Sequence, residues 1–332
     1  MSTGLSALLI FIGVGIGVWL VSFVVEALRP VPREPQKLRW APDLPVEHVE
    51  VGGNTLRYLK TGRGPNLVLL HTLRTQLDLF EKVIPELSRH FTVYALDYPG
   101  HGCSDIPKAR YDAAFFTEAV EGFLDRLDLR DVTLAGVSIG GSIALIIAAR
   151  RNPRVLRVVA INPYDYAKGR GMARSSLFGG IVTYASLLPV IGETVMRLRN
   201  FLIMRAVLNG GVAAADSIPP ALLKEMYLVG NRPGHYRAFL SLLRNAETWE
   251  TATKNYGRIE VPVLLVWGDD SFNAAAGMAK LAYAAAYIRA NMPFGVRYLD
   301  PVLSEQQAWD VAALMISKPR PPAPPGAESE LR

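Results

Sequence analysis

A serine with the surroundings of a nucleophile occupies position 138, in the run Gly136-Val137-Ser138-Ile139-Gly140. The apolar residues 132–137 before it predict a strand, and residues 141–151 after it predict a helix. A residue on such a sharp strand-to-helix turn takes a strained backbone conformation, so the residues two positions before and two after must be very small. Gly136 and Gly140 meet this requirement. The spacing is typical of a serine nucleophile raised on a tight elbow.

The chemistry that this serine indicates is acyl transfer. The backbone N–H of Ile139, at the expected start of the helix, is placed to stabilise a negative charge on a carbonyl oxygen. A serine hydroxyl is a weak nucleophile until a base takes its proton, so an accompanying base is required. The strand would carry Ser138 to the carboxyl edge of a parallel sheet, where α/β proteins form their ligand sites.

The elements that must position Ser138 alternate between strand and helix. We expect strands at residues 48–51, 56–60, 67–72, 92–96, 132–137, 155–161 and 261–267, and helices at residues 77–88, 113–127 and 141–151. This order predicts the α/β class, with a mostly parallel sheet covered on both faces. Residues 164–255 interrupt the alternation with a mainly helical segment, which reads as an insertion between two strands of one sheet.

Three stretches carry a resemblance to a known family: the elbow in residues 134–141, Asp97-Tyr98-Pro99-Gly100-His101-Gly102-Cys103-Ser104-Asp105, and residues 261–269. Over residues 46 to about 270, the chain resembles the α/β-hydrolase superfamily. The resemblance implies an α/β-hydrolase fold, a helical cap formed by the insertion, and a serine hydrolase that acts on a carboxylic ester or related acyl compound. It also implies that the N–H of Leu73 is the second oxyanion donor, although Thr72 stands where the family usually has glycine.

The acid and the base of the expected triad stay open. The family position for the acid falls on Ser271, so Asp270 beside it, Asp165 after the preceding strand, and no functional acid at all are the alternatives. The family's histidine follows the last strand, and here that position is near Asp300.

All five histidines precede the last strand: His48, His71, His90, His101 and His235. We expect His71 and His101 to be architectural, His48 and His90 to be exposed, and His235 to lie in the cap, from which it could reach Ser138. Loss of a triad member typically lowers the rate by about 10⁴ or more. A catalytically impaired pseudo-hydrolase, a binding or scaffold protein, is therefore the alternative function.

The N-terminal segment predicts a membrane helix. Residues 1–25 contain no charged side chain, and residues 5–25 are almost wholly apolar, which matches the roughly 20 residues that cross a bilayer. The start lacks a positive charge and the end lacks an Ala-x-Ala-like site, so we favour an uncleaved single-pass anchor over a signal peptide. Basic residues follow at Arg29, Arg33, Lys37 and Arg39, and they favour a cytoplasmic location for the rest of the chain.

Composition narrows the partners. The net charge is +6 and the pI is about 9.4. The lysines and arginines form no dense basic cluster of the kind that binds nucleic acid, so we do not expect nucleic acid as a partner. One cysteine, Cys103, excludes an intramolecular disulfide and a cysteine-based zinc site. The resemblance implies neither a cofactor nor a metal. The expected partners are therefore the membrane and a small or lipid-like acyl substrate, which apolar stretches of the cap could hold.

These observations divide the chain as follows: an anchor at residues 1–28, a proline-rich linker at 29–45, the core at 46–163 and 256–317, a cap at 164–255, and a disordered tail at 318–332. The resemblance fades after Asp269, where alanine-rich sequence begins. A disruption of the reading frame would also produce that shift.

Overall fold

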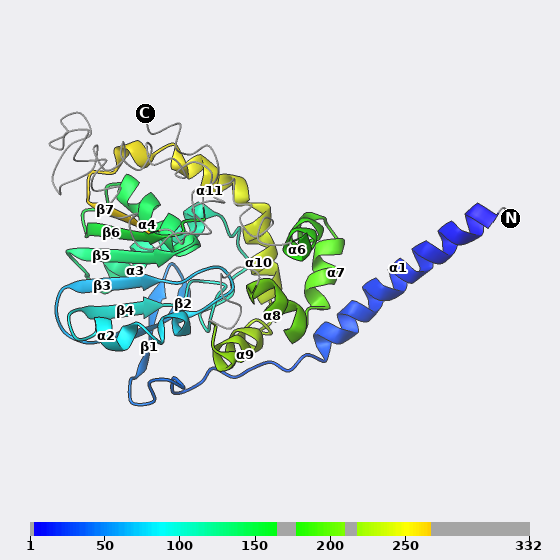
Figure 1. Cartoon of the computed structure of the whole chain (residues 1–332), viewed down its shortest axis with the longest axis horizontal. Helices are drawn as coiled ribbons and strands as arrows, with labels where there is room; N and C mark the ends of the chain where they lie inside the picture. Colours follow the sequence, from blue (N-terminus) through cyan, green and yellow to red (C-terminus); the bar gives the residue numbers. More distant parts are fainter. Residues whose placement is uncertain (1–2, 165–176, 210–217, 267–332) are drawn as a thin grey trace, which may run out of the picture.

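The computed structural model describes residues 3–164, 177–209 and 218–266. Seven strands form one sheet in the order β1-β2-β4-β3-β5-β6-β7 (Figure 1). Their bounds are β1 Val46–Val51, β2 Asn54–Thr61, β3 Asn66–Leu70, β4 Thr92–Leu96, β5 Val132–Val137, β6 Val155–Ile161 and β7 Val263–Val266. β1 and β2 pair antiparallel, β2 and β4 pair antiparallel, and the other pairs are parallel. The predicted mostly parallel sheet is confirmed.

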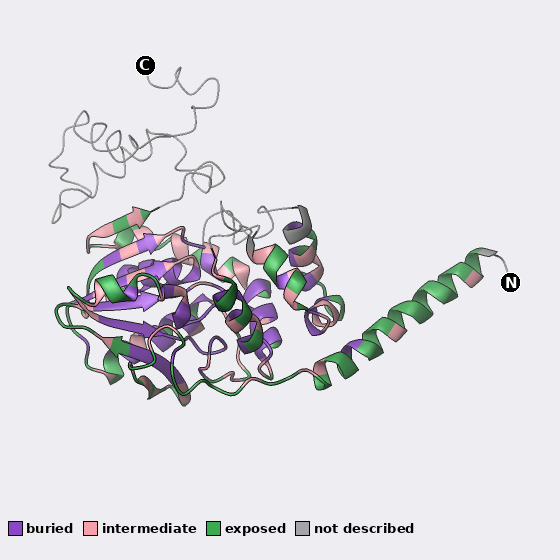
Figure 2. Ribbon diagram, turned by 60° about the horizontal axis from the view of Figure 1, so that its bottom comes forward, coloured by how far each residue is buried: buried purple, intermediate pink, exposed green. Residues whose placement is uncertain are grey.

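Both faces of the sheet are buried. In β3, Val68 and Leu70 face one apolar cluster, whereas Leu67 and Leu69 face the other, as the two-residue period of a strand requires. The first cluster includes side chains from α3 (Ala113–Arg126), α4 (Ile139–Ala149) and α11 (Ala246–Thr253). The second includes side chains from the 3₁₀ helix η1 (Leu77–Phe80) and the short helix α2 (Ile84–Leu87). Burial is therefore concentrated around the strands, as Figure 2 shows.

A capping side chain and a proline fix the positions at which α3 and α2 begin. α3 starts after Asp112, whose side chain accepts a hydrogen bond from the N–H of Phe115, a favourable N-cap. All eleven residues of α4 are buried. The single helix expected at residues 77–88 is instead split into η1 and α2. Pro85 lies in the first turn of α2, where its missing N–H costs no helical bond, so the chain starts a new helix there.

The described part of the segment between β6 and β7 consists mainly of helices joined by short turns. It contains α6 Leu177–Leu187, α7 Ile191–Arg197, α8 Phe201–Asn209, α9 Pro220–Val229, α10 His235–Arg244 and α11, followed by the 3₁₀ turn η4 Tyr256–Arg258. Helices α6 to α10 gather at one end of the sheet, on the side of α1 (Thr3–Ala27) (Figure 1). We refer to α6 to α10 as the cap. α11 packs on α3 and α4 instead, and its Trp249 is fully buried.

Candidate active site

Ser138 lies on a strained turn between β5 and α4. Its φ is 55° and its ψ is −116°, a conformation that residues with a Cβ seldom adopt. A Cβ on Gly136 would lie 2.1 Å from the carbonyl carbon of Gly140, and a Cβ on Gly140 would lie 2.2 Å from the carbonyl oxygen of Leu70. Both distances are far inside van der Waals contact. The two glycines are therefore required by the geometry of the turn itself.

Hydrogen bonds from β6 and the residues after it hold the turn in place. The N–H of Ser138 donates to the carbonyl of Ile161 over 2.8 Å. The N–H of Tyr164 lies 3.2 Å from the carbonyl of Ser138 and 2.8 Å from the hydroxyl of Ser142. The Ser138 side chain itself is half-buried. The strained backbone is thus fixed from two sides, and Ser138 remains partly exposed.

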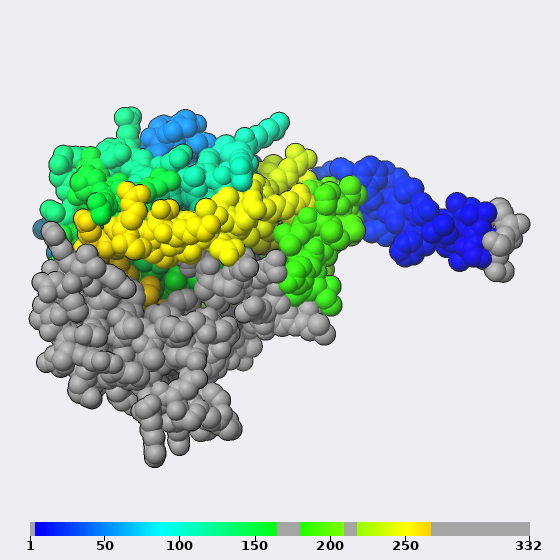
Figure 3. Space-filling model, turned by 90° about the horizontal axis from the view of Figure 1, so that it is seen from above, coloured from blue at the N-terminus to red at the C-terminus, as the bar shows by residue number. Residues whose placement is uncertain are grey.

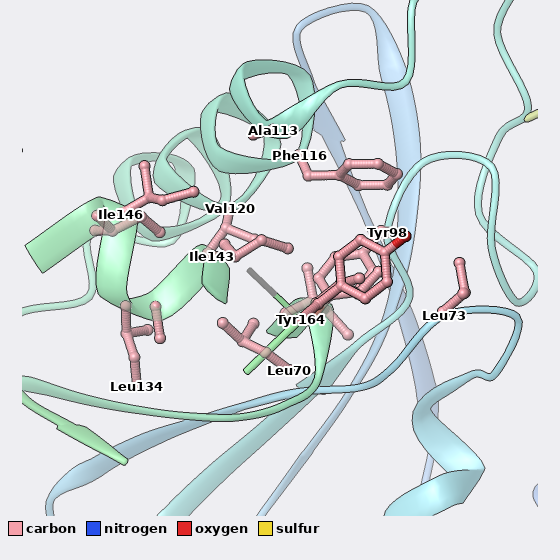
Figure 4. Close-up of a cluster of buried hydrophobic side chains, with 14 of the residues drawn as sticks. Leu70, Leu73, Tyr98, Ala113, Phe116, Val120, Leu134, Ile143, Ile146 and Tyr164 are labelled. Carbon is pink, nitrogen blue, oxygen red and sulfur yellow. The ribbon is translucent and has the colours of Figure 1, made fainter. Parts of the chain in front are cut away.

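The loop after β3 runs beside this turn. Leu70 pairs with Gly136 across β3 and β5, so Leu73 and Ser138 follow neighbouring strand ends at the same edge of the sheet. Thr75 closes a turn by donating from its N–H and its hydroxyl to the carbonyl of Thr72. Within the described residues, the N–H groups of Leu73 and Ile139 have no hydrogen-bond acceptor. Figure 4 shows Leu73 on this loop, at the edge of the cluster that contains Tyr98 and Tyr164.

His71 and His101 are buried inside the framework. His71 Nδ1 lies 2.8 Å from the carbonyl of Thr72, and its Nε2 accepts from the N–H of Tyr98, so both ring nitrogens are engaged. Burial lowers the pKa of His71 to about 3, and burial together with the neighbouring His71 lowers that of His101 to about 3. The two rings, with centroids 5.5 Å apart, are therefore neutral.

The other three histidines differ in exposure. The side chains of His48 and His90 are 43% and 69% exposed. His235, the first residue of α10, is buried, and its ring centroid lies 6.1 Å from that of His101. Its Nδ1 has no hydrogen-bond partner, and burial lowers its pKa well below the ordinary value. All five histidines lie in described residues, and none of them hydrogen-bonds Ser138.

The loop after β4 is built around Asp97. Its carboxylate accepts from the N–H of Leu77, from the N–H of Cys103 and from the guanidinium of Arg57, at 2.7, 2.9 and 2.7 Å. A Cβ on Gly102 would lie 2.0 Å from the Asp97 carboxyl carbon. Burial raises the pKa of the Cys103 thiol to about 11, which keeps it protonated. This loop is therefore architectural.

Arg74 is a residue that we did not single out from the sequence. It follows Leu73, with φ 56°, and its guanidinium lies 4.7 Å from the centre of the Phe239 ring on α10. Burial and the nearby Arg199 lower its pKa to about 10, so it stays charged. The sequence gives no sign of the contact between Arg74 and Phe239, since only the fold brings the loop after β3 against the cap.

Other expected site residues cannot be placed. Asp165, Asp270, Ser271 and Asp300 lie outside the described residues, as do the tail at 318–332 and the break after Asp269. Two surface hollows of about 260 and 380 Å³ lie elsewhere, and their lining includes neither Ser138 nor Leu73. The first lies among residues of α3, α4 and α11, and the second lies at the amino ends of β5 and β6.

Comparison with known proteins agrees with this geometry. Residues 65–285 match the α/β hydrolase fold family. A pimeloyl-[acyl-carrier protein] methyl ester esterase of Chromobacterium violaceum is 29% identical over 73% of this chain and 88% of its own. A 2-(acetamidomethylene)succinate hydrolase of Mesorhizobium japonicum is 31% identical over 48% of this chain and 63% of its own. The crystal structure of Cfl2 from Burkholderia cenocepacia superimposes with a TM-score of 0.61 at 21% identity, over 71% of this chain and 83% of that one.

The family match covers most of the chain from β3 onward, and strands β3 to β7, the elbow and the helical insertion lie within it. The chain belongs to the α/β hydrolase fold family.

Proposed function

We propose that this protein is a membrane-anchored serine hydrolase that cleaves a carboxylic ester or a related acyl compound through Ser138. The observation that carries the proposal is the elbow: a partly exposed serine on a strained turn, beside two backbone N–H groups without acceptors among the described residues. The activities for which the two relatives are named, those of a methyl ester esterase and a hydrolase, support the same class of reaction.

In this mechanism the Ser138 hydroxyl attacks the acyl carbon, and the N–H groups of Ile139 and Leu73 donate hydrogen bonds to the carbonyl oxygen as it becomes negatively charged. The alcohol leaves, and water then hydrolyses the acyl-enzyme. Asp165 and Asp270 remain our candidates for the acid. His235 is our candidate for the base, because its Nδ1 lacks a partner and it lies in the cap.

A fluorophosphonate probe tests the nucleophile. We expect the wild-type protein in detergent to be labelled once, and Ser138→Ala to lose the label. Ser88→Ala is the control that keeps it, since the Ser88 hydroxyl bonds only the carbonyl of Pro85. If His235 takes the proton, His235→Gln should slow labelling by about 10² or more. Absence of labelling in folded wild-type protein would contradict the hydrolase and support the pseudo-hydrolase.

We further propose that α1 is an uncleaved anchor and that the rest of the chain is cytoplasmic. The stretch Gly4–Ala27 has 24 residues and a mean hydropathy of 2.7, although a signal sequence has the same properties. Support for retention comes from the cap, since Arg199 contacts Glu26 and Arg197 contacts Ser22 of this helix. Cleavage would leave these buried guanidinium groups without those partners.

The anchor is tested by fractionation of cells that express the chain with a tag at each end. We expect both tags in carbonate-washed membranes, and we expect protease added outside intact spheroplasts to spare the C-terminal tag. Release of a shortened chain into the soluble fraction would show that α1 is a signal sequence.

A further inference from the structure

The last two turns of α1 are fastened to the cap by three arginines. Arg197 donates to the Ser22 hydroxyl over 2.9 Å, and its guanidinium lies 3.9 Å from the centre of the Phe23 ring. Arg199 pairs with the Glu26 carboxylate at 2.7 Å. Arg29 donates to the carbonyls of Arg197 and Arg199 at 2.7 and 2.9 Å. A network of this kind fixes the angle between α1 and the cap, since guanidinium groups form directional bonds.

The contacts of Arg197 and Arg199 with α1 show in which direction α7 runs relative to α1. Arg199 contacts Glu26, whereas Arg197 contacts Ser22 and Phe23, about one helical turn earlier in α1. Residues that precede Arg197 in α7 are therefore directed toward the apolar middle of α1. Ile191, where α7 begins, is six residues before Arg197, which corresponds to about 9 Å along a helix. Helix α7 packs against the C-terminal end of α1, and the start of α7 and the turn before it lie past the charged network, while the rest of α1 runs away from the cap (Figures 1 and 3).

This end of the cap is apolar and open. We define the cap tip as the exposed residues of α6, the α6–α7 turn and the start of α7: Ile181, Tyr184, Leu187, Leu188, Val190 and Ile191. Leu188, Val190 and Ile191 are 51%, 58% and 49% exposed. Residues 177–192 contain no charged side chain. Adjacent exposed apolar residues without charge mark a contact surface rather than ordinary protein surface.

We propose that the cap tip inserts into the bilayer interface next to α1, as a second membrane contact of the same molecule. This inference rests on the proposed function, in that α1 must lie in the membrane. The occupant is lipid, because the tip lies next to the helix that packs against the last turns of α1 and, like α1, exposes apolar side chains without charge. The arginines lie nearer the charged end of α1, at headgroup level. The cap would then rest on the surface that holds lipid-like acyl substrates.

Fluorescence quenching in lipid nanodiscs tests the inference with the full chain. In a Cys103→Ser background, a polarity-sensitive dye is attached at Leu188→Cys, at Val14→Cys in the middle of α1, or at Glu86→Cys, whose native side chain is 66% exposed. Nitroxide groups high on the acyl chains should quench the Leu188 dye about twofold, and groups near the bilayer centre should quench the Val14 dye. The Glu86 dye should be insensitive to both.

Three other outcomes would each contradict one part of the proposal: the insertion of the tip, the anchor, or lipid as the occupant. A quenched Val14 dye with a water-exposed, unquenched Leu188 dye would keep the anchor and refute insertion of the tip. An unquenched Val14 dye would refute the anchor itself. A Leu188 dye in an apolar environment that nitroxide lipids do not quench would show that protein covers the tip. If the Leu188 dye reports a water-exposed environment in nanodiscs that hold a single chain, the protein that covers the tip is a second copy of this chain.

Discussion

At the residue scale, the candidate site depends on what glycine lacks. Gly136 and Gly140 lie so close to neighbouring backbone atoms that an added Cβ would meet a carbonyl group within about 2 Å. These atoms belong to the backbone of β3 and α4 and cannot rotate aside. The position of the Ser138 hydroxyl is consequently determined by two residues that carry no functional group.

Gly140→Ala should therefore destabilise the protein by more than 3 kcal/mol or prevent folding, because β3 and α4 must separate to admit the methyl group. Gly257→Ala is the matched control, since a Cβ there meets nothing within 4 Å. Thermal unfolding followed by tryptophan fluorescence in detergent measures both. Equal stability of the two variants would contradict the steric account.

Ser138 stores strain that a glycine would release. We expect the free energy of unfolding of Ser138→Gly to exceed that of Ser138→Ala by about 1 kcal/mol, because only the alanine retains a Cβ at φ 55°. The glycine variant should therefore unfold at the higher temperature. Both variants lack the hydroxyl, so the comparison isolates the backbone. The same thermal unfolding experiment decides the order, and a more stable alanine variant would show that the turn is not strained.

At the element scale, a buried ion pair joins the loops that surround the site. Arg57 on β2 is fully buried and contacts Asp97 after β4 and Asp78 in η1. A buried charge that loses its partner typically costs about 3–5 kcal/mol. Three elements thus depend on one guanidinium.

Asp97→Asn should lower the free energy of unfolding by about 3 kcal/mol, since it removes the charge opposite Arg57 and replaces one of the two oxygens that accept backbone N–H groups with an amide NH2 group. Glu86→Gln, which breaks the exposed pair with Arg89, should change it by less than about 1 kcal/mol. Chemical denaturation in detergent measures both changes. Similar effects of the two substitutions would refute the distinction between buried and exposed pairs.

The buried histidines make these elements sensitive to acid. His71 and His101 have pKa values of about 3 in the folded protein against 6.5 when exposed, so the unfolded chain binds more protons between these values. Stability is complete above about pH 6.5 and is lost as the pH falls toward 3. Each histidine should contribute a loss of about 2 kcal/mol between pH 7.5 and 5.

Denaturation at a series of pH values checks this expectation. The exposed-residue variant His90→Gln should show the same decline as the wild type, because His90 keeps contact with water in both states. A free energy of unfolding that stays constant from pH 7.5 to 5 would contradict the neutral, buried state of the two rings.

At the scale of the whole molecule, α1 is joined to the cap by the arginine network as well as by the linker. Glu26 is the carboxylate that Arg29 and Arg199 share. A change in the tilt of α1 would therefore be transmitted to α7.

Glu26→Gln should loosen α7 without affecting the sheet. We expect amide hydrogen exchange in residues 191–199 to rise about tenfold in lipid nanodiscs, and exchange in β3 and β5 to stay unchanged. Glu118→Gln, on α3 away from α1, is the control. Unchanged exchange in α7 would show that the arginine network does not hold the cap.

Much of the fold could be predicted from periodicity and turn residues. β4, β5 and β6 have the predicted bounds, because short apolar runs between turn signals leave little choice. The helical pattern at residues 77–88, which Pro85 interrupts, is divided into η1 and α2, and apolar spacing alone does not show where the first of them ends. The apolar stretch 187–191 belongs to the cap, whose apolar stretches we considered as a site for an acyl substrate, and the structure leaves it exposed.

The sequence by itself determined the elbow, since a serine between glycines at the end of an apolar run can form few other turns, and it determined the membrane-length helix, since length and hydropathy are local properties. Only the tertiary structure decided which groups meet: the neutral histidines behind the loop after β3, Arg74 against the cap, and the arginines that bind α1. These depend on contacts between residues up to 202 positions apart. Burial, which sets the charge of a histidine and the strength of an ion pair, exists only once the chain has folded.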